Sequence, residues 1–356
     1  MVIAGGGTGG HLTPALALGR ELAGRGADVL LVAGTRGPDR AFLAGAELPH
    51  RFLATPAVER HRWWRNAAMP WRLARAVAAA RAMLREHRPR VAVGTGGYVS
   101  VPVILAARAA GIPVLLQEQN SVPGLATRFL ARFADRVCVQ YEEAVARLGG
   151  HGIVEVTGSP IAPLERAEAD FAERLDPARP TLGVFGASQG ARGINDAVLE
   201  LLEADPDRAP FNLVWQTGAA DLGRIEAAAD WPGRFVIRRF FSPMGAVYPR
   251  LDLIVCRGGA MTLAEVTAWG IPAIVVPYPH ATADHQSANA HALESAGAAI
   301  VVPERDLPAR RLGHLIEGLL ADPGRRAVMA AAARALGRPR AAATVADRVL
   351  EIAGAA

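Results

Sequence analysis

The sequence lacks lysine altogether, so all 39 of its basic residues are arginine. They exceed the 34 acidic residues and give a formal net charge of +5 at pH 7. Arginine makes planar, two-pronged contacts with phosphate and carboxylate groups, so a phosphorylated ligand or an anionic membrane surface suits this excess. Because the sequence also lacks a long basic run, we do not expect a nucleic-acid partner.

Cysteine is nearly absent as well. Cys138 and Cys256 are the only two in 356 residues, and each lies in an apolar run typical of a strand. We therefore expect buried free thiols in a reducing compartment rather than a disulfide. A signal-peptide pattern is also missing, and prolines and glycines interrupt the uncharged stretches at 91–107 and 266–283. These absences favour a cytoplasmic protein without a spanning helix, and they leave contact with a membrane surface open.

Short apolar runs alternate with helical patterns along the whole chain. The runs do not alternate between polar and apolar residues, so they predict an α/β fold whose parallel sheets are covered on both faces. The expected strands are 2–4, 29–33, 91–93, 114–116, 137–139, 181–185, 213–216, 235–237, 253–255 and 273–276. The expected helices are 14–23, 71–87, 101–110, 194–202, 260–269, 287–296 and 344–353.

The pattern starts again after the segment TGSPIAP at residues 157–163. Each half opens with a strand, a glycine-rich loop and a helix, which is typical of a doubly wound domain. We predict one domain over residues 1–160 and a second over 161–339. The helix within 340–356 is expected to pack back on the first domain.

The first glycine-rich loop, GGGTGGH, ends at His11 and is followed by Thr13 and Pro14. Glycines after a strand let backbone N–H groups approach a ligand, and the next helix adds its positive end. Thr13 is expected to cap that helix and Pro14 to begin it. The loop matches the dinucleotide pattern GxGxxG, but the second strand ends in Gly34 and Thr35 instead of an acid for the ribose. We therefore expect no nicotinamide cofactor, and a purely structural turn remains the alternative.

Three further loops of this kind follow strands: GTGGY (94–98), GASQG (186–190) and CRGGAMTLAE (256–265). Open α/β sheets bind ligands at the carboxyl ends of their strands, so we expect the four loops to hold one ligand in a crevice between the domains. The helix from Ala260 could hold a diphosphate, and Glu265 could accept hydrogen bonds from both hydroxyls of a ribose. An ordinary acid that serves the helix dipole is the alternative for Glu265.

Six segments together are similar to those of one known family, from Met1 to about Val302. They are GGGTGGHLTPALAL, GTGGYVSVP, GIPVLLQEQNSVPG, GASQGARGIN, CRGGAMTLAEVTAWGIPAIVVPYP and DHQSANAHALESAGAA. In order and spacing they resemble the MurG family of glycosyltransferase family 28. The resemblance implies the GT-B fold, in which two doubly wound Rossmann-like domains face a central cleft. It implies inverting transfer of N-acetylglucosamine from UDP-N-acetylglucosamine to the C4 hydroxyl of a lipid-linked muramoyl-pentapeptide, which completes lipid II in peptidoglycan synthesis.

The resemblance also implies which residues contact these substrates. In the second domain Phe241 would hold the uracil, largely through backbone, and Glu265 the ribose. Ser188 and Gln189 would sit at the phosphates, and Gln286 and His285 would face the sugar hydroxyls. The N-terminus of the helix would be covered by Ala260, Met261, Thr262, Leu263 and Ala264. From the first domain, the sugar or acceptor would be approached by Thr8, Gly9, Gly10 and Asn120.

One departure from the family concerns Ala162, which stands where the family usually has an arginine. Arg192 and Arg257 are candidates to replace the phosphate or uracil contact of that arginine. No D-x-D pattern follows a strand, so we expect a mechanism without a metal ion, in which helix dipoles and N–H groups stabilise the leaving diphosphate.

His11 is the expected general base, because imidazole titrates near neutral pH. Glu118 is the rival for that role, and it could instead bind a sugar hydroxyl or orient Asn120. Tyr98 could contact the acceptor diphosphate or be a partly buried loop residue.

A segment rich in arginine and tryptophan, residues 61–90, bears on the membrane. Its tryptophans could enter the headgroup region and its arginines could meet anionic lipids of the inner leaflet. The residues concerned are Trp63, Trp64, Trp71, Arg62, Arg65, Arg72 and Arg75. The alternative is a solvated surface helix with its tryptophans turned inward. With the family resemblance, we expect peripheral attachment at the cytoplasmic face of the cell membrane.

Other functions remain as alternatives at this point. A related GT-B enzyme, such as a UDP-sugar 2-epimerase or a glycolipid synthase, would share most of these motifs. A non-catalytic module that binds a nucleotide sugar is a further alternative.

Overall fold

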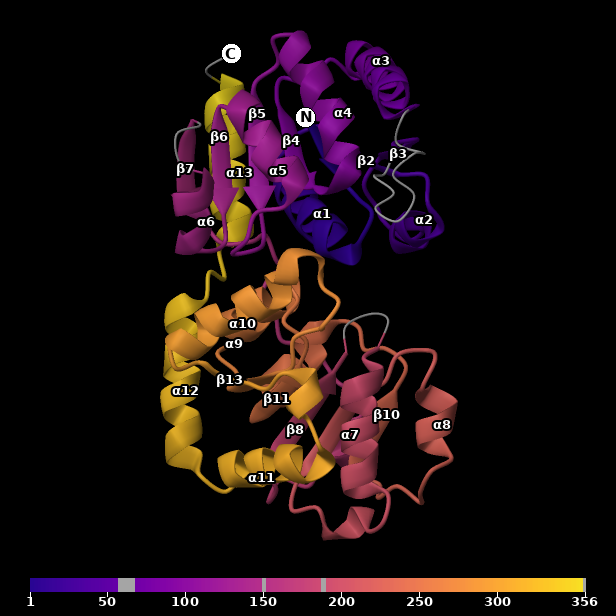
Figure 1. The fold of residues 1–356 in the computed structure, drawn as a ribbon, viewed down its shortest axis with the longest axis vertical. Coiled ribbons are helices and arrows are strands. Elements are labelled where there is room, and N and C mark those ends of the chain that lie inside the picture. Colours follow the sequence, from indigo (N-terminus) through magenta and orange to yellow (C-terminus); the bar gives the residue numbers. More distant parts are fainter. Residues whose placement is uncertain (57–67, 149–151, 187–189, 355–356) are drawn as a thin grey trace. The chain divides into compact units, whose positions relative to one another are not determined.

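The computed structural model describes residues 1–56, 68–148, 152–186 and 190–354. Its chain divides into two compact units (Figure 1). The first unit comprises Met1–Ala162 with Arg340–Ala356, and the second comprises Pro163–Pro339. Each unit has a parallel sheet with helices on both faces, so the predicted α/β class with two Rossmann-like domains is confirmed.

The first unit is built on a seven-stranded sheet in the order β3-β2-β1-β4-β5-β6-β7, with every pair parallel. The strands are β1 (Val2–Gly5), β2 (Leu30–Gly34), β3 (His50–Leu53), β4 (Ala92–Gly96), β5 (Val114–Glu118), β6 (Arg136–Val139) and β7 (Ile153–Val156). Val2 pairs with Leu30 on one side and with Ala92 on the other. The strand order reverses between β1 and β4, which is where sheets of this kind bind ligands.

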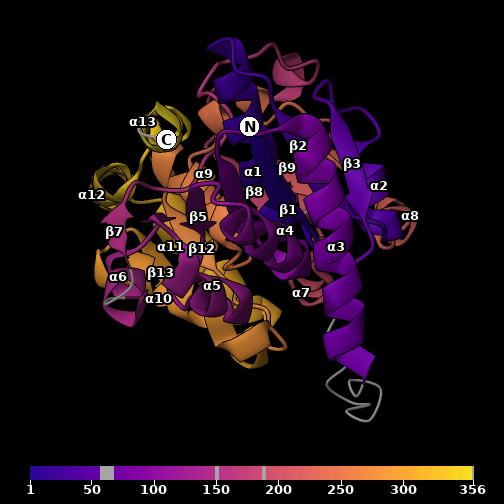
Figure 2. The ribbon, with the colours of Figure 1, turned by 90° about the horizontal axis from the view of Figure 1, so that it is seen from above.

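Helices cover both faces of this sheet. They are α1 (Gly9–Gly24), α2 (Gly37–Leu43), α3 (Met69–His87), α4 (Gly97–Ala109), α5 (Leu125–Leu130), α6 (Glu142–Leu148) and α13 (Ala341–Gly354). Successive residues of a strand point to opposite faces. Val2 accordingly packs with Ile104 of α4, while Ile3 packs with Leu18 of α1 and Val345 of α13. Figure 2 shows α3, α4 and α5 beside one another, with α4 packed against both neighbours.

The second unit repeats the design with six parallel strands in the order β10-β9-β8-β11-β12-β13. The strands are β8 (Thr181–Phe185), β9 (Asn212–Gln216), β10 (Phe235–Arg238), β11 (Leu253–Cys256), β12 (Ala273–Val275) and β13 (Ala299–Val301). The helices are α7 (Arg192–Leu202), α8 (Leu222–Glu226), α9 (Ala260–Trp269), α10 (His285–Ser295), α11 (Ala309–Leu320) and α12 (Pro323–Leu336).

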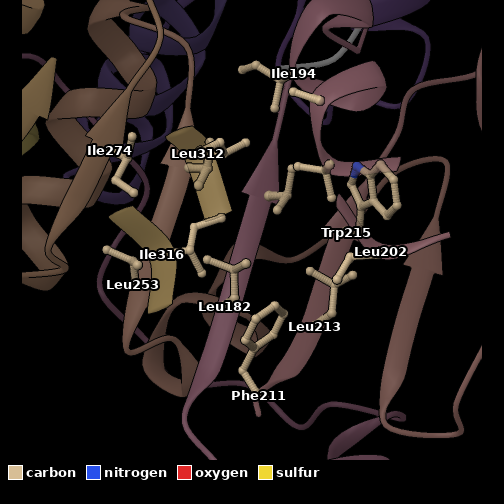
Figure 3. Close-up of a cluster of buried hydrophobic side chains, with 14 of the residues drawn as sticks. Leu182, Ile194, Leu202, Phe211, Leu213, Trp215, Leu253, Ile274, Leu312 and Ile316 are labelled. Atoms are coloured by element: carbon tan, nitrogen blue, oxygen red, sulfur yellow. The ribbon is translucent and has the colours of Figure 1, made fainter. Parts of the chain in front are cut away.

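The core of the second unit lies under α7 and α11 (Figure 3). Trp215 is fully buried there among aliphatic side chains that include Leu182, Ile194 and Ile316. Its indole Nε1 donates a hydrogen bond of 3.0 Å to Asn195 Oδ1, which meets the polar requirement of a buried tryptophan.

Two expectations about the first loops are wrong. Helix α1 begins at Gly9, with Thr8 in an extended conformation as its N-terminal cap residue, so Thr13 and Pro14 lie inside the helix. GTGGY is not a loop either, because β4 runs to Gly96 and α4 begins at the next residue. At the second place glycines continue the strand directly into the helix, whereas Gly6, Gly7 and Thr8 still form a short loop between β1 and α1.

The direct junction between β4 and α4 requires glycine. Gly97 has a φ of +77°, and a Cβ atom there would lie 2.1 Å from the carbonyl oxygen of Gly6. We expect Gly97→Ala to lower the free energy of unfolding by more than about 2 kcal/mol, because it combines backbone strain with a collision. Urea denaturation measures this. Gly24→Ala at the end of α1 is the control, because a Cβ there meets no heavy atom within 4 Å. Equal stability of the two variants would contradict this packing.

Candidate active site

The glycine loop after β1 is fixed by a buried carboxylate. Asp39, at 1% exposure, accepts hydrogen bonds from Gly7 N at 3.0 and 2.9 Å and from Gly34 N at 2.8 Å. A Cβ atom on Gly6 would lie 2.5 Å from Asp39 Oδ2, so the loop closes tightly around this side chain. The N–H of Gly7 is thereby engaged within the protein.

Thr8, Gly9 and Gly10 remain exposed at the start of α1. The first N–H groups of a helix have no carbonyl partner within it, so this helix start is able to donate to an anionic or carbonyl ligand. The three residues predicted to approach the sugar or acceptor are thus accessible, while the preceding glycines are structural.

His11 lies in the first turn of α1, and its ring packs against the β4–α4 junction. A Cβ atom on Gly96 would lie 2.6 Å from His11 Nδ1, so the ring occupies the space that a side chain would need. His11 Nδ1 is 3.2 Å from Gln119 Oε1. Thr95 Oγ1 also donates to the carbonyl oxygen of His11 at 2.9 Å, which anchors the backbone of the same residue.

Glu118, the rival base, is held by backbone and amide groups. Its Oε1 accepts from Asn120 N at 3.1 Å and from Asn120 Nδ2 at 3.0 Å, and its Oε2 accepts from Gly124 N at 3.1 Å. The side chain is 2% exposed. This carboxylate therefore organises the 118–124 segment and orients Asn120, an arrangement that favours His11 over Glu118 as a base.

Tyr98 is the second residue of α4 and is 41% exposed. Its ring is therefore accessible to a ligand at the same edge of the sheet that carries His11.

In the second unit, the starts of α9 and α10 lie together at the carboxyl ends of β11 and β12. A Cβ atom on Gly258 would lie 2.4 Å from the carbonyl oxygen of Gln286, and Asn289 Nδ2 donates to the carbonyl oxygen of Gly258 at 3.2 Å. Gln286 Oε1 accepts from Tyr278 N at 3.0 Å. His285, the first residue of α10, is half-buried on this edge, with its Nδ1 2.6 Å from the carbonyl oxygen of Thr282.

The five residues that open α9 differ in what they offer a ligand. All of them except Thr262 are buried, and Leu263 N already donates to the carbonyl oxygen of Gly259 at 3.0 Å. Ala260, Met261 and Thr262 have the N–H groups that a helix start leaves without an internal acceptor. An anion at this end would therefore be bound by backbone, with the helix dipole adding to the attraction.

Glu265 is the one carboxylate on α9. Its Oε2 accepts a hydrogen bond of 2.8 Å from the hydroxyl of the buried Tyr248. Burial raises the pKa of Glu265 to about 7, and the Tyr248 hydrogen bond opposes this rise. The desolvated carboxylate is thus able to exchange protons near neutral pH.

Arg257 does not project toward solvent. It is 7% exposed, forms an ion pair with Glu304, and donates to the carbonyl oxygens of Val276 and Pro277 at 3.3 and 3.4 Å. The guanidinium expected to meet a ligand is thus bonded to protein groups. The side chain of Arg192 is 78% exposed, and its Nε lies 3.8 Å from Asp196 Oδ2. Arg192 is therefore the more accessible of the two candidates for the missing family arginine.

Phe241 is also more buried than expected of a residue that contacts a base. Its ring packs edge-on against Phe171, and its N–H donates to Gln216 Oε1 at 3.0 Å. A backbone contact from Phe241 to a uracil would therefore have to use its carbonyl oxygen.

Some predicted residues lie outside the described residues, namely Ser188, Gln189, Arg62, Trp63, Trp64 and Arg65. Trp71, at the start of α3, is 69% exposed, so the inward orientation considered for the tryptophans is wrong for this one. Within the four described ranges, no helix is long and apolar enough to cross a membrane. Nor do the described residues bring three or more His, Cys, Asp or Glu side chains together as a metal site would.

Two family profiles match this chain: the glycosyltransferase family 28 N-terminal domain over residues 1–139, and the C-terminal domain over residues 181–345. A Desulforudis audaxviator protein named UDP-N-acetylglucosamine–N-acetylmuramyl-(pentapeptide) pyrophosphoryl-undecaprenol N-acetylglucosamine transferase is 37% identical, over 99% of this chain and 98% of its own. The Chlorobaculum tepidum protein of the same name is 40% identical, over 99% of each chain.

Solved structures agree with these relatives. MurG of Acinetobacter baumannii has a TM-score of 0.78 at 29% identity, over 98% of this chain and 99% of that one. A calicheamicin glycosyltransferase has a TM-score of 0.71 at 15% identity, over 99% and 98% of the two chains, which indicates a common fold alone.

The raised pKa of Glu265 predicts a pH-dependent stability. The folded-state pKa of about 7 exceeds the ordinary value of 4.5, so between these values the folded protein binds more protons than the unfolded one. This carboxyl therefore lowers the free energy of unfolding as pH rises from 4.5 to above 7. Glu265→Gln removes the charge and keeps an oxygen for Tyr248. We expect it to be more stable than wild type at pH 8 by roughly 1–2 kcal/mol, with the difference shrinking toward pH 5.

Urea denaturation at both pH values measures the effect. Glu226→Gln, at an exposed position of α8, is the control and should change stability little at either pH. A stability difference for Glu265→Gln that is the same at pH 5 and pH 8 would contradict the pKa.

Proposed function

Because this chain belongs to glycosyltransferase family 28, we propose that it transfers N-acetylglucosamine from UDP-N-acetylglucosamine to the lipid-linked N-acetylmuramyl-pentapeptide, as the names of its relatives state. The observation that carries the proposal is identity of 37% and 40% to such enzymes over 99% of the chain. The enzyme is a hexosyltransferase that turns lipid I into lipid II. An epimerase or a binding module is not favoured by these relatives.

The second unit supplies the donor site in this proposal. The Glu265 carboxylate accepts from the ribose hydroxyls, and the N–H groups at the start of α9 bind the diphosphate. As UDP leaves, its growing negative charge is stabilised by those same N–H groups and by the positive end of the helix dipole. His285 and Gln286, at the start of α10, are placed next to this helix end and serve the sugar hydroxyls.

The first unit supplies the base and the acceptor contacts. His11 takes the proton from the C4 hydroxyl of the muramyl unit as that oxygen attacks the anomeric carbon. The bond from the anomeric carbon to the UDP oxygen breaks, UDP leaves with the electron pair, and the configuration inverts. Thr8, Gly9, Gly10, Tyr98 and Asn120 are the acceptor or sugar contacts on this side.

Transfer of labelled N-acetylglucosamine to a soluble lipid I analogue tests the proposal. We expect His11→Ala to lower kcat by about 100-fold or more, because a general base contributes 10²–10⁴-fold, while the Kd for UDP stays within about twofold. Glu265→Ala should weaken UDP binding, since it removes the ribose acceptor. Normal turnover by His11→Ala would overturn the assignment of the base.

The same assay separates the other functions. Formation of the manno epimer from UDP-N-acetylglucosamine alone would indicate an epimerase. Tight UDP binding without transfer would indicate a binding module, and either result from the wild-type protein would refute the proposal.

The acceptor carries a lipid, and the first unit has a surface suited to a membrane. Trp71 on α3 and Leu125 on α5 are each 69% exposed, and Phe129 lies one turn after Leu125 at 40%. Exposed arginines accompany them, namely Arg72, Arg75, Arg128 and Arg132. Apolar side chains with adjoining arginines suit the interface of an anionic bilayer. In this proposal the protein acts peripherally at the cytoplasmic face of the cell membrane.

Sedimentation with phosphatidylglycerol vesicles tests this surface. The triple variant Trp71→Ser, Leu125→Ser, Phe129→Ser should bind at least about tenfold more weakly than wild type, because it removes the inserted apolar area. Binding should also fall with salt and be weak to phosphatidylcholine. Val328→Ser is the control, since Val328 is equally exposed but lies on α12 of the other unit. Undiminished binding by the triple variant would contradict the assignment.

A further inference from the structure

The side chain of Gln119 faces the imidazole of His11 from the residue that follows β5. Gln119 is 2% exposed, and its Oε1 is the atom 3.2 Å from His11 Nδ1. Such a contact matters because a neutral imidazole carries a hydrogen on one ring nitrogen and a lone pair on the other. The hydrogen-bond partner of one ring nitrogen determines which nitrogen carries the hydrogen.

The amide of Gln119 has only one acceptable orientation. Its Nε2 donates to the carbonyl oxygen of Thr95 at 2.8 Å and to that of Gln117 at 3.2 Å. Both carbonyl oxygens are acceptors, so turning the amide over would set oxygen against oxygen at two places. Oε1 must therefore face His11, and an amide oxygen can only accept.

The ring itself is also held in place. Gly96 and Gly97 leave no room for a Cβ atom beside His11, since it would lie 2.6 Å from Nδ1 at Gly96 and 3.2 Å from Cδ2 at Gly97. Thr95, which accepts from Gln119 through its carbonyl, donates through Oγ1 to the His11 carbonyl. One strand end thus fixes both the backbone of His11 and the amide that faces its ring.

We infer that Gln119 is a positioning residue that keeps the hydrogen of His11 on Nδ1 and the lone pair on Nε2. This inference rests on the proposed function in one respect, that Nε2 is the atom which takes the acceptor proton. The amide of Gln119 fixes the tautomer as a neutral hydrogen-bond acceptor. An aspartate beside a catalytic histidine also adds a negative charge.

The test is ¹⁵N nuclear magnetic resonance of the full-length protein with labelled histidine, at a pH where imidazole is neutral. The His11 signal is identified by its loss in His11→Ala. Wild type should show hydrogen on Nδ1. Gln119→Met, which keeps the length and removes the acceptor, should shift His11 toward the form with hydrogen on Nε2. It should lower kcat by roughly 10- to 100-fold, with KM for UDP-N-acetylglucosamine within about twofold.

Gln140→Met is the matched control, because Gln140 is a buried glutamine of the same unit that accepts from Ser159 N instead of facing His11. It should leave the tautomer and kcat unchanged. Hydrogen on Nε2 in the wild type would overturn the inference without any variant, and so would an unchanged tautomer in Gln119→Met. Absence of transferase activity in the wild type would instead refute the proposed function, since the tautomer is measured without turnover.

Discussion

The close approach of the β1–α1 segment to the end of β4 is the contact on which the first unit's site depends. A Cβ atom on Gly5 would lie 2.1 Å from Thr95 Oγ1, and one on Gly97 would lie 2.1 Å from the carbonyl oxygen of Gly6. This approach occurs where the strand order reverses, so two helix starts emerge from adjacent strand ends. His11 and Tyr98 come from those two helices, and neither could be so placed if side chains separated the strands.

In the second unit, other residues allow a similarly close approach of two helix starts near the point where the strand order reverses. There the reversal lies between β8 and β11, and Gly258 beside Gln286 brings the start of α10 against the loop that precedes α9. Backbone N–H groups then supply the positive potential that an anionic ligand needs. In the proposed donor site the start of α9 attracts the diphosphate through its dipole, without the charge of Arg257, which is buried with Glu304.

Strands at the centre of each sheet could be predicted because burial on both faces leaves uninterrupted apolar runs, as in β8 and β11. The edge strands β3, β7 and β13 were not predicted. In β3 and β7 charged and apolar residues are mixed, as HRFL and IVEV show, and a short sequence of this kind resembles a loop. Strand β13 is apolar but has only three residues, AIV. Thr13 and Pro14 gave a misleading helix start, because Pro14 is the sixth residue of α1, an interior position that proline usually avoids.

The site residues divide in a similar way. His11, Glu118 and Glu265 lie in recognisable motifs, whereas the importance of Asp39 and Gln119 arises from partners distant in the sequence. Asp39 bonds a residue 32 positions earlier, and Gln119 faces one 108 positions earlier. No local pattern contains such a contact. An acid in the first turn of a helix that follows a strand and a glycine is the only signal Asp39 offered.

The hydrogen-bond donors around each carboxylate distinguish Asp39 and Glu118, which are bonded within the chain, from Glu265, for which we propose a ribose contact. Asp39 accepts from two backbone N–H groups, and Glu118 accepts from two more and an amide, so both charges are stabilised within the chain. Among the described residues, Glu265 accepts only from the Tyr248 hydroxyl, and burial without further donors raises its pKa to about 7. In the proposed donor site, two ribose hydroxyls donate hydrogen bonds to this carboxylate, which has few donors within the protein. These hydrogen bonds stabilise the charged form of the buried carboxylate. The free energy of UDP binding at this proposed site therefore includes hydrogen bonds that Glu265 lacks in the free protein.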